Sequence, residues 1–343
     1  MTGSSGHNLG FVYATSPIAP DFGKLIDGLR ERTGISNWVG TIGHGICATG
    51  AEVFDAPAAV ALTGAFADGT YSLLPSVTKS TPSAGLTQPG FIAGFGVVHG
   101  DPRNQDVIGV VKSLAETTGA FLVGGLTSAD QGFPQVAGGR VIDGGVSGVL
   151  LGGRLNVAVG LTQGCSPVGP THEVTAGDGQ IIEKLDDRSA YEILCEDVGI
   201  AEGADPRPWL RDVHAALPVS GSDQADYMVR NLMGLDNKQG LVAITEQLSR
   251  GDKVMFVRRD AESAEKDLNR MIGDLKGRVS GAPKAGLYFS CVARGPNLFK
   301  KKAHEMKAIK AAFGDIPIAG FFGNGEISND RVYGYTGVLA LFS

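Results

Sequence analysis

Phe121-Leu122-Val123-Gly124-Gly125-Leu126-Thr127-Ser128 predicts an aliphatic strand that ends in a Gly-rich polar tip. It follows Val107–Gly119, where apolar residues recur at helical spacing and a glycine is placed to end the helix. Two other stretches repeat this order of helix, closing glycine, strand and tip: Leu25–Gly34 with Trp38–Gly45, and Ala303–Gly314 with Ile316–Glu326. We call these stretches copies one, two and three in chain order, so that the quoted stretch is copy two. The repetition predicts a scaffold that presents three tips together.

A fourth helix with a clear apolar stripe is predicted from Asp260 to Gly277. Each of the four helices is preceded by an apolar run typical of a strand: Phe11–Thr15, Phe91–His99, Lys253–Val257 and Gly286–Cys291. Strand–helix–strand alternation predicts parallel pairs joined by right-handed crossovers. Antiparallel strands are expected at Ala58–Leu62, Val146–Leu151, Leu155–Gly160 and Tyr335–Phe342. The predicted fold class is therefore α/β, with two regions of mixed β-sheets built from strand-helix-strand-hairpin units and helices on the outside.

The chain changes character near Cys165–Pro170, so we expect one region at 1–170 and a second at 171–343. Val174–Leu185 is predicted to form a hairpin around Gly177-Asp178-Gly179. A helix is expected at about 188–196. The weakly patterned stretch 197–225 contains several prolines and is interpreted as a loop or insertion.

Composition narrows the class of protein. Hydrophobic residues make up 43% of the 343 residues and charged residues 19%, which is typical of a globular chain. The net charge is −6 and no stripe of Lys and Arg stands out, so neither nucleic acid nor a membrane surface is expected as a partner. The four cysteines have neither zinc-ligand nor redox spacing, so no metal site is predicted. The chain shows no signal-peptide pattern and no apolar run of about 18 residues, and we expect a cytoplasmic protein.

Two charged residues near the third tip are the leading ligand-binding candidates. Arg294 follows the strand that ends at Cys291, and the carboxyl ends of such strands face the ligand crevice of open α/β sheets. Its guanidinium can hold a carboxylate or phosphate, or form a structural ion pair, for which Glu326 is the expected partner. Glu326 can accept from a ligand amine, act as a general base, or anchor its own loop.

The other candidate ligand-binding residues lie at the tips or beside Arg294: Gly323, Asn324, Gly325, Cys291, Asn297, Thr127, Ser128 and His44. Structural alternatives exist for most of them. Thr127 and Ser128 can cap a turn, Cys291 can be a buried inert thiol, and His44 can bond to its own loop. The sequence therefore favours the third tip as the functional one.

Several motifs resemble those of FIST-domain proteins. Tyr288–Gly295 and Ala319–Ile327 resemble signatures of the C-terminal FIST region, and Leu161–Pro170 resembles the hinge before it. Val39–Gly45 and Val123–Ser128 resemble the N-terminal region. The resemblance covers nearly the whole chain and assigns the FIST N-terminal region to 1–170 and the C-terminal region to 171–343.

This resemblance implies a stand-alone bacterial sensor of intracellular signal transduction that binds a small ligand. A signalling protein such as a histidine kinase is the partner that it implies. Some bacterial members are haem-binding nitric-oxide sensors, and in that alternative His44, His99 and Cys165 are the axial-ligand candidates. A further alternative is an enzyme that uses Glu326 as acid or base. No clear nucleophile–base pair supports catalysis, and the catalytic residues stay unassigned.

Overall fold

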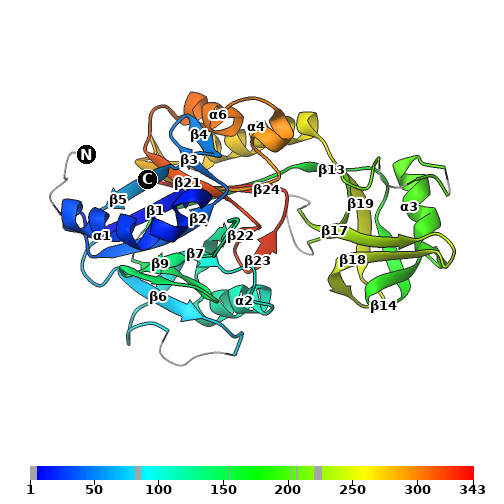
Figure 1. Cartoon of the computed structure of the whole chain (residues 1–343), viewed down its shortest axis with the longest axis horizontal. Coiled ribbons are helices and arrows are strands. Elements are labelled where there is room, and N and C mark those ends of the chain that lie inside the picture. Colours follow the sequence, from blue (N-terminus) through cyan, green and yellow to red (C-terminus); the bar gives the residue numbers. More distant parts are fainter. Residues whose placement is uncertain (1–5, 82–85, 154, 202, 206–207, 220–225) are drawn as a thin grey trace. The chain divides into compact units, whose positions relative to one another are not determined.

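The computed structural model describes residues 6–343 except 82–85, 154, 202, 206–207 and 220–225 (Figure 1). The chain forms two compact units. The first contains Met1–Gln163 and Asp267–Ser343, and the second contains Gly164–Lys266. The units therefore do not follow a sequential division into 1–170 and 171–343, because the third copy returns to the unit that holds the first two. The mixed sheets with helices confirm the α/β class.

All three copies form the predicted parallel crossover. The elements are β1 (Leu9–Thr15), α1 (Phe22–Thr33) and β2 (Asn37–Gly43); β7 (Ala93–Gly100), α2 (Val107–Thr118) and β8 (Phe121–Leu126); and β20 (Ala285–Cys291), α6 (His304–Phe313) and β21 (Ile318–Gly323). A short 3-10 helix η1 (Ser16–Asp21) precedes α1, and α5 (Pro296–Phe299) precedes α6. Each first strand also pairs with an antiparallel return strand: β5 (Ala59–Gly64), β11 (Val146–Gly152) or β24 (Thr336–Phe342).

The hairpin that follows each tip does not complete the sheet of its own copy. Hairpin β3–β4 (Gly45–Ala48, Ala51–Phe54) joins the third copy, where β3 pairs with β21. Hairpin β9–β10 (Gln135–Ala137, Arg140–Ile142) joins the first copy, where β9 pairs with β2. Hairpin β22–β23 (Glu326–Ser328, Arg331–Tyr333) joins the second copy, where β22 pairs with β8. The exchange closes a cycle of three sheets, and β6 (Tyr71–Val77) and β12 (Val157–Gln163) extend two of them.

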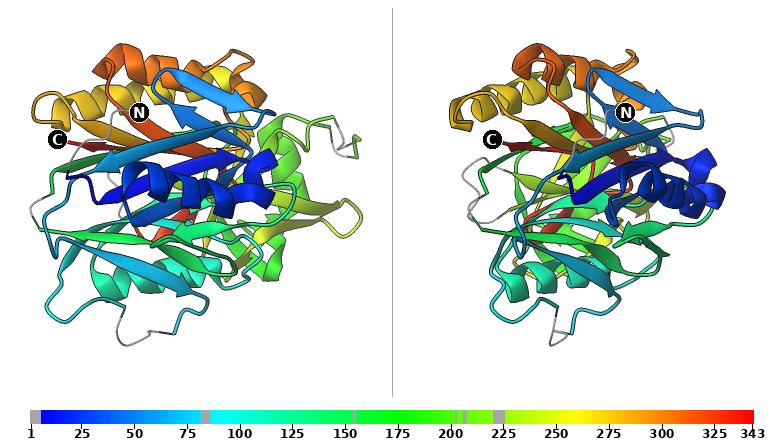
Figure 2. Two further views of the ribbon diagram at one scale, coloured as in Figure 1. Left: turned by 60° about the vertical axis from the view of Figure 1, so that its left-hand side comes forward. Right: turned by 90° about the vertical axis from the view of Figure 1, so that its left-hand side faces the viewer.

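Equivalent residues of the three first strands meet between the sheets. These residues are Tyr13 of β1, His99 of β7 and Phe289 of β20. Each pairs with the residue that directly follows a glycine found at the same position of all three second strands: Gly40, Gly124 or Gly320. Their ring centroids lie 5.5 to 6.4 Å apart, and Phe321 stacks on Tyr13 at 5.2 Å. Away from this centre each helix packs on the sheet of its own copy, as Figures 1 and 2 show for α1, α2 and α6.

The fourth predicted crossover is wrong. β19 (Lys253–Arg259) belongs to the second unit and pairs there with antiparallel neighbours, while α4 (Ala261–Arg278) leads back to the first unit. Periodicity identified both elements but carries no information about the sheet that each joins. In the first unit, α4 covers the free edge of β12: Asp267 accepts from the Gln163 N–H at 2.7 Å, and Arg270 and Arg278 donate to the carbonyls of Leu161 and Val159.

The second unit holds one sheet in the order β13-β19-β16-β17-β18-β14-β15 and the helix α3 (Ala190–Val198). Its other strands are β13 (Cys165–Pro167), β14 (His172–Leu185), β15 (Arg188–Ser189), β16 (Val213–Pro218), β17 (Tyr227–Asp236) and β18 (Leu241–Leu248). The hairpin predicted at Val174–Leu185 is wrong, because β14 runs through as one bulged strand. The stretch 197–225 is also not all loop, since β16 is a buried inner strand within it.

One glycine in each second strand is required by close packing. Gly40, Gly124 and Gly320 face the carbonyl oxygens of Val12, Val98 and Tyr288, and a Cβ at any of them would overlap that oxygen. We expect Gly124→Ala to lower the free energy of unfolding by about 3 kcal/mol or more, because the parallel pair must separate. Gly273→Ala, in an open position of α4, should instead stabilise by up to about 1 kcal/mol. Urea midpoints of the two variants check this, and equal midpoints would contradict it.

Candidate functional site

The three tips meet, and Ser128 joins them. Its hydroxyl accepts from the backbone N–H of His44 at 2.9 Å and donates to the carbonyl of Phe322 at 2.5 Å. The backbone N–H of Ser128 donates to Ile42 at 3.2 Å. The second tip therefore bridges the first and the third, and the sequence prediction that the tips are presented together is confirmed.

The polar residues of the tips differ in access. Thr127 is fully buried, and its hydroxyl lies 2.7 Å from that of Thr41. Asn324 is exposed, and its amide donates to the Thr127 carbonyl at 3.3 Å. The ring of His44 is about one-third exposed, with Nδ1 3.9 Å from Asp130. The hydroxyls of the second tip are thus engaged in structure, whereas Asn324 and His44 face outward.

Arg294 is fully buried at the start of the loop after β20. Its Nε donates to Glu305 at 2.9 Å, so its ion-pair partner is Glu305 rather than Glu326. Its Nη1 lies 3.5 Å from the Tyr335 carbonyl. Burial lowers the pKa of Arg294 and the charge of Glu305 raises it, with a net rise that keeps the guanidinium charged.

Glu305 is a residue of the candidate site that sequence reasoning missed. Besides Arg294, its carboxylate accepts from the Tyr288 hydroxyl at 2.6 Å, the Ser290 hydroxyl at 3.1 Å and the Gly295 N–H at 3.2 Å. In the sequence Glu305 has an ordinary explanation, since acidic residues are common in the first turn of a helix. The approach of β20 to the start of α6 is the information that the sequence does not contain.

The exchanged hairpin brings a second acid to this cluster. Glu52, on β4, accepts from the backbone N–H groups of Glu305 and Met306 at 3.1 Å each. It therefore caps α6, whose own N-cap residue Ala303 provides no side-chain hydrogen bond. Burial, and next the charge of Glu305, raise the pKa of Glu52 to about 7.

Glu326 is fully buried at the start of β22. Its Oε2 accepts from the hydroxyl and the backbone N–H of Thr336 at 2.7 and 3.2 Å. Burial raises the pKa of Glu326 to about 8, although Thr336 and Arg294 act in the opposite direction. Among the residues that the structure describes, neither its other oxygen, Oε1, nor Nη2 of Arg294 has a hydrogen-bond partner. One buried donor and one buried acceptor or acid are thus left unused at the third tip.

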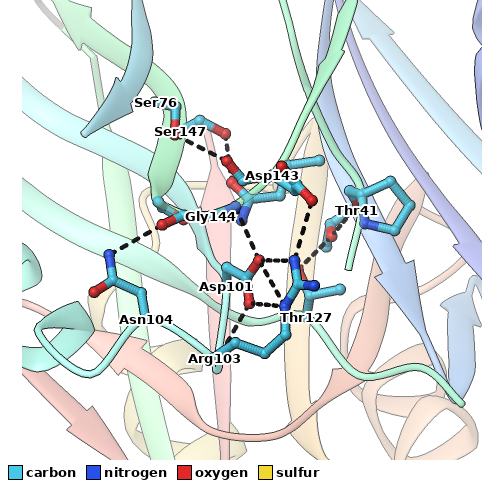
Figure 3. Close-up of polar contacts among 12 residues, drawn as sticks. Thr41, Ser76, Asp101, Arg103, Asn104, Thr127, Asp143, Gly144 and Ser147 are labelled. Atoms are coloured by element: carbon cyan, nitrogen blue, oxygen red, sulfur yellow. Dashed lines mark hydrogen bonds and ion pairs between the residues drawn. The ribbon is translucent and has the colours of Figure 1, made fainter. Parts of the chain in front are cut away.

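The second and third copies hold the ends of their first strands alike. Figure 3 shows Asp101, which accepts from the backbone N–H groups of Arg103 and Gly144, both at 2.9 Å. In the third copy Cys291 accepts from the corresponding N–H groups of Ala293 and Tyr335. Burial raises the pKa of the Cys291 thiol, so it is protonated at neutral pH and is not an activated nucleophile.

The turn at Tyr335 is strained. Gly144 adopts a φ of 81°, which glycine tolerates, whereas Tyr335 adopts a φ of 62°. A bulky residue in this region costs free energy, and such outliers concentrate at functional sites. Cys291 and Arg294 hold the N–H and the carbonyl of Tyr335, and Glu326 holds the N–H of the next residue. Three of the candidate residues, Cys291, Arg294 and Glu326, therefore converge on one strained turn.

Gly323 and Gly325 are buried in the third tip, and Gly323 accepts from the Val292 N–H at 2.9 Å. Asn297 is exposed, and its amide donates to the Val292 carbonyl at 2.8 Å. It therefore lies on the same loop as Arg294 but outside the buried cluster.

The structure tests one haem-ligand candidate, His99, directly. His99 is fully buried among aromatic rings, its Nε2 lies 3.2 Å from the Tyr13 hydroxyl, and burial lowers its pKa to about 3. A porphyrin does not fit over a ring packed in this way. Cys165 is buried in the second unit, and His44 lies on the first tip. The residues present at His99 therefore do not fit haem.

Family models match almost the whole of this chain. The FIST N domain matches residues 8–188, and the FIST C domain matches residues 190–329. The chain belongs to the FIST family. FIST domains are associated with sensing in signal transduction. The boundary between the two family matches falls near β15 and does not coincide with either boundary between the compact units.

Similar proteins occur in bacteria and in vertebrates. An uncharacterized protein of Mycobacterium tuberculosis is 33% identical over 240 residues, or 65% of this chain and 61% of that protein. An uncharacterized protein of Mycobacterium bovis is 34% identical over 217 residues, or 59% and 54%. F-box only protein 22 of Homo sapiens is 44% identical over 48 residues, or 14% and 12%. The chain spans about three-fifths or less of the length of these relatives.

Among the described residues, no helix is long and apolar enough to cross a membrane.

The buried ion pair is expected to dominate the stability of the third copy. Replacing Arg294 by Met leaves Glu305 buried without a counter-charge, which should cost about 3–5 kcal/mol in the free energy of unfolding. Adding Glu305→Gln should recover part of this loss. The exposed pair of Arg30 and Asp27 provides the control, and Arg30→Met should cost less than about 1 kcal/mol. Equal losses in chemical denaturation for the two arginine variants would contradict this interpretation.

Glu326 predicts a pH-dependent stability. A carboxyl group whose pKa rises on folding, from about 4.3 to about 8, stabilises the fold fully below pH 4 and loses this contribution as the pH rises toward 8. Relative to Glu326→Gln, the wild-type chain should therefore lose up to about 1.4 kcal/mol per pH unit between pH 5 and 8. Denaturation curves across this range test it, with the exposed Glu31→Gln as control. A constant difference between wild type and Glu326→Gln would show that Glu326 stays ionised.

Proposed function

We propose that this FIST protein is a sensory protein of signal transduction that binds a small polar ligand at the third Gly-rich tip. The observation that carries the proposal is the pair of unused buried atoms, Arg294 Nη2 and Glu326 Oε1. Buried polar groups almost always have a partner, so two of them in one cluster point to a partner that comes from outside the chain.

The chemistry of the two atoms defines the class of ligand. Arg294 Nη2 donates to a carboxylate or carbonyl oxygen. Glu326 Oε1 accepts from an amine or amide when ionised and donates when protonated, and a pKa near 8 makes both forms accessible at neutral pH. An amino acid or a related small carboxylate satisfies both atoms, and the exposed amide of Asn324 offers a further contact at the rim of the tip.

The strained turn at Tyr335 supplies the means of response. Arg294 and Glu326 hold this turn through Nη1 and Oε2, and their unused atoms Nη2 and Oε1 belong to the same two side chains. A ligand that binds Nη2 and Oε1 therefore shifts these side chains and alters their contacts with the turn. Release of the turn alters the surface presented to a receiver. We propose a signalling protein such as a histidine kinase as that receiver, which rests on the family alone.

Native mass spectrometry of the purified protein, followed by thermal-shift assays with amino acids and small carboxylic acids, tests the proposal. We expect a saturable rise of the melting temperature with one class of compound. Glu326→Gln should weaken that binding at least tenfold and Asn324→Ala should weaken it less. The exposed Asn269→Ala should bind as wild type. A lack of any shift, with no co-purified mass, would indicate that water satisfies both atoms, and binding unchanged in Glu326→Gln would reject the site.

A further inference from the structure

A concave surface lies in the first unit, at the opposite end of the parallel strands from the tips. It is a groove of about 350 Å³ between the sheet that contains β7, β8 and β11 and the edge strand β12. The side chains that line it are apolar except for that of Arg278, and the lining residues are Gly94, Phe95, Phe121, Leu151, Gly153, Leu155, Val157, Val159 and Arg278. The volume lies in the range of small-molecule sites.

Phe121 is not explained by the fold. It is the first residue of β8, it lines the groove, and it is 38% exposed. The equivalent positions in copies one and three carry Asn37 and Pro317, so the architecture does not require a large apolar side chain there. Ile92, two residues before Gly94, is 83% exposed. A large apolar side chain that is exposed at a concave surface is typical of a binding site.

Arg278 provides a charge at the groove that no carboxylate neutralises. Its Nη2 donates to the Val159 carbonyl at 2.8 Å, and it forms no ion pair in the part of the chain described. Arg270, on the same helix, is by contrast paired with Asp267 and Asp274. The remaining N–H groups of Arg278 are therefore free to hold an anion whose apolar part lies in the groove.

We propose that this groove binds a free aliphatic carboxylic acid, with the chain against Phe95, Phe121, Val157 and Val159 and the carboxylate on Arg278. The proposal is independent of the ligand at the third tip, because the two sites share no residue and lie at opposite strand ends. Each methylene buried should strengthen binding about fourfold.

The test is calorimetric titration of the full chain with octanoate, decanoate and dodecanoate below their micellar concentrations. We expect the dissociation constant to fall about fifteenfold for every two methylenes added. Arg278→Gln should weaken dodecanoate about tenfold and leave dodecanol unchanged, whereas Phe121→Ser should weaken both. Arg32→Gln is the matched control, since Arg32 also lies in the last turn of a helix and is exposed.

Three outcomes would overturn the proposal. The first is an affinity that does not depend on chain length, and the second is an Arg278→Gln variant that binds dodecanoate as wild type. The third is that the protein sediments with phosphatidylglycerol vesicles but does not bind the free acids. This result would identify a lipid surface as the occupant of the groove. Melting temperatures of Arg278→Gln and Phe121→Ser within a few degrees of wild type establish that both are folded.

Discussion

The exchange of hairpins between the three copies is the constraint on which the first unit depends. No copy completes its own sheet, since β21, β2 and β8 each pair with a hairpin from another copy. A single copy would expose one strand edge and carry a hairpin without a partner. The copies must therefore assemble together, and their tips are brought to one place by the same pairing. Ser128, which is buried and forms hydrogen bonds to both other tips, holds the three tips together.

The same exchange explains why the charged cluster forms only in the third copy. Glu52 arrives on a strand from the first copy and caps α6, which fixes Glu305 beside Arg294. Glu326 begins the hairpin that leaves for the second copy. Three carboxyl groups thus lie near one guanidinium. Burial raises the pKa of Glu52 and of Glu326, and the charge of Glu305 adds to both rises.

The sequence predicted the parts of the fold that depend on local pattern. In the three copies the helical stripes, the closing glycines Gly34, Gly119 and Gly314, and the polar tips appear where periodicity and turn chemistry placed them. The glycine expected to end the fourth helix, Gly277, lies inside α4 instead. It did not predict the exchanged strands, because Gln135–Ala137 and Arg331–Tyr333 are too short to carry a periodic signal. It identified Arg294 but not its partner, since Glu305 has an ordinary role at the start of a helix. Lys253–Val257 was assigned to the wrong sheet because a strand pattern does not name its neighbour.

The contact between Gln163 and Asp267 has a consequence for the modular organisation of the chain. The two residues mark the points where the backbone leaves the first unit and returns to it, and one hydrogen bond of 2.7 Å joins them. The segment between these two residues is therefore an insertion in the first unit, whose own strands pair with one another without it. The entropic cost of such an insert grows only slowly with its length. The intervening segment is free to diverge, lengthen or be exchanged for another module while the three-sheet scaffold keeps its geometry.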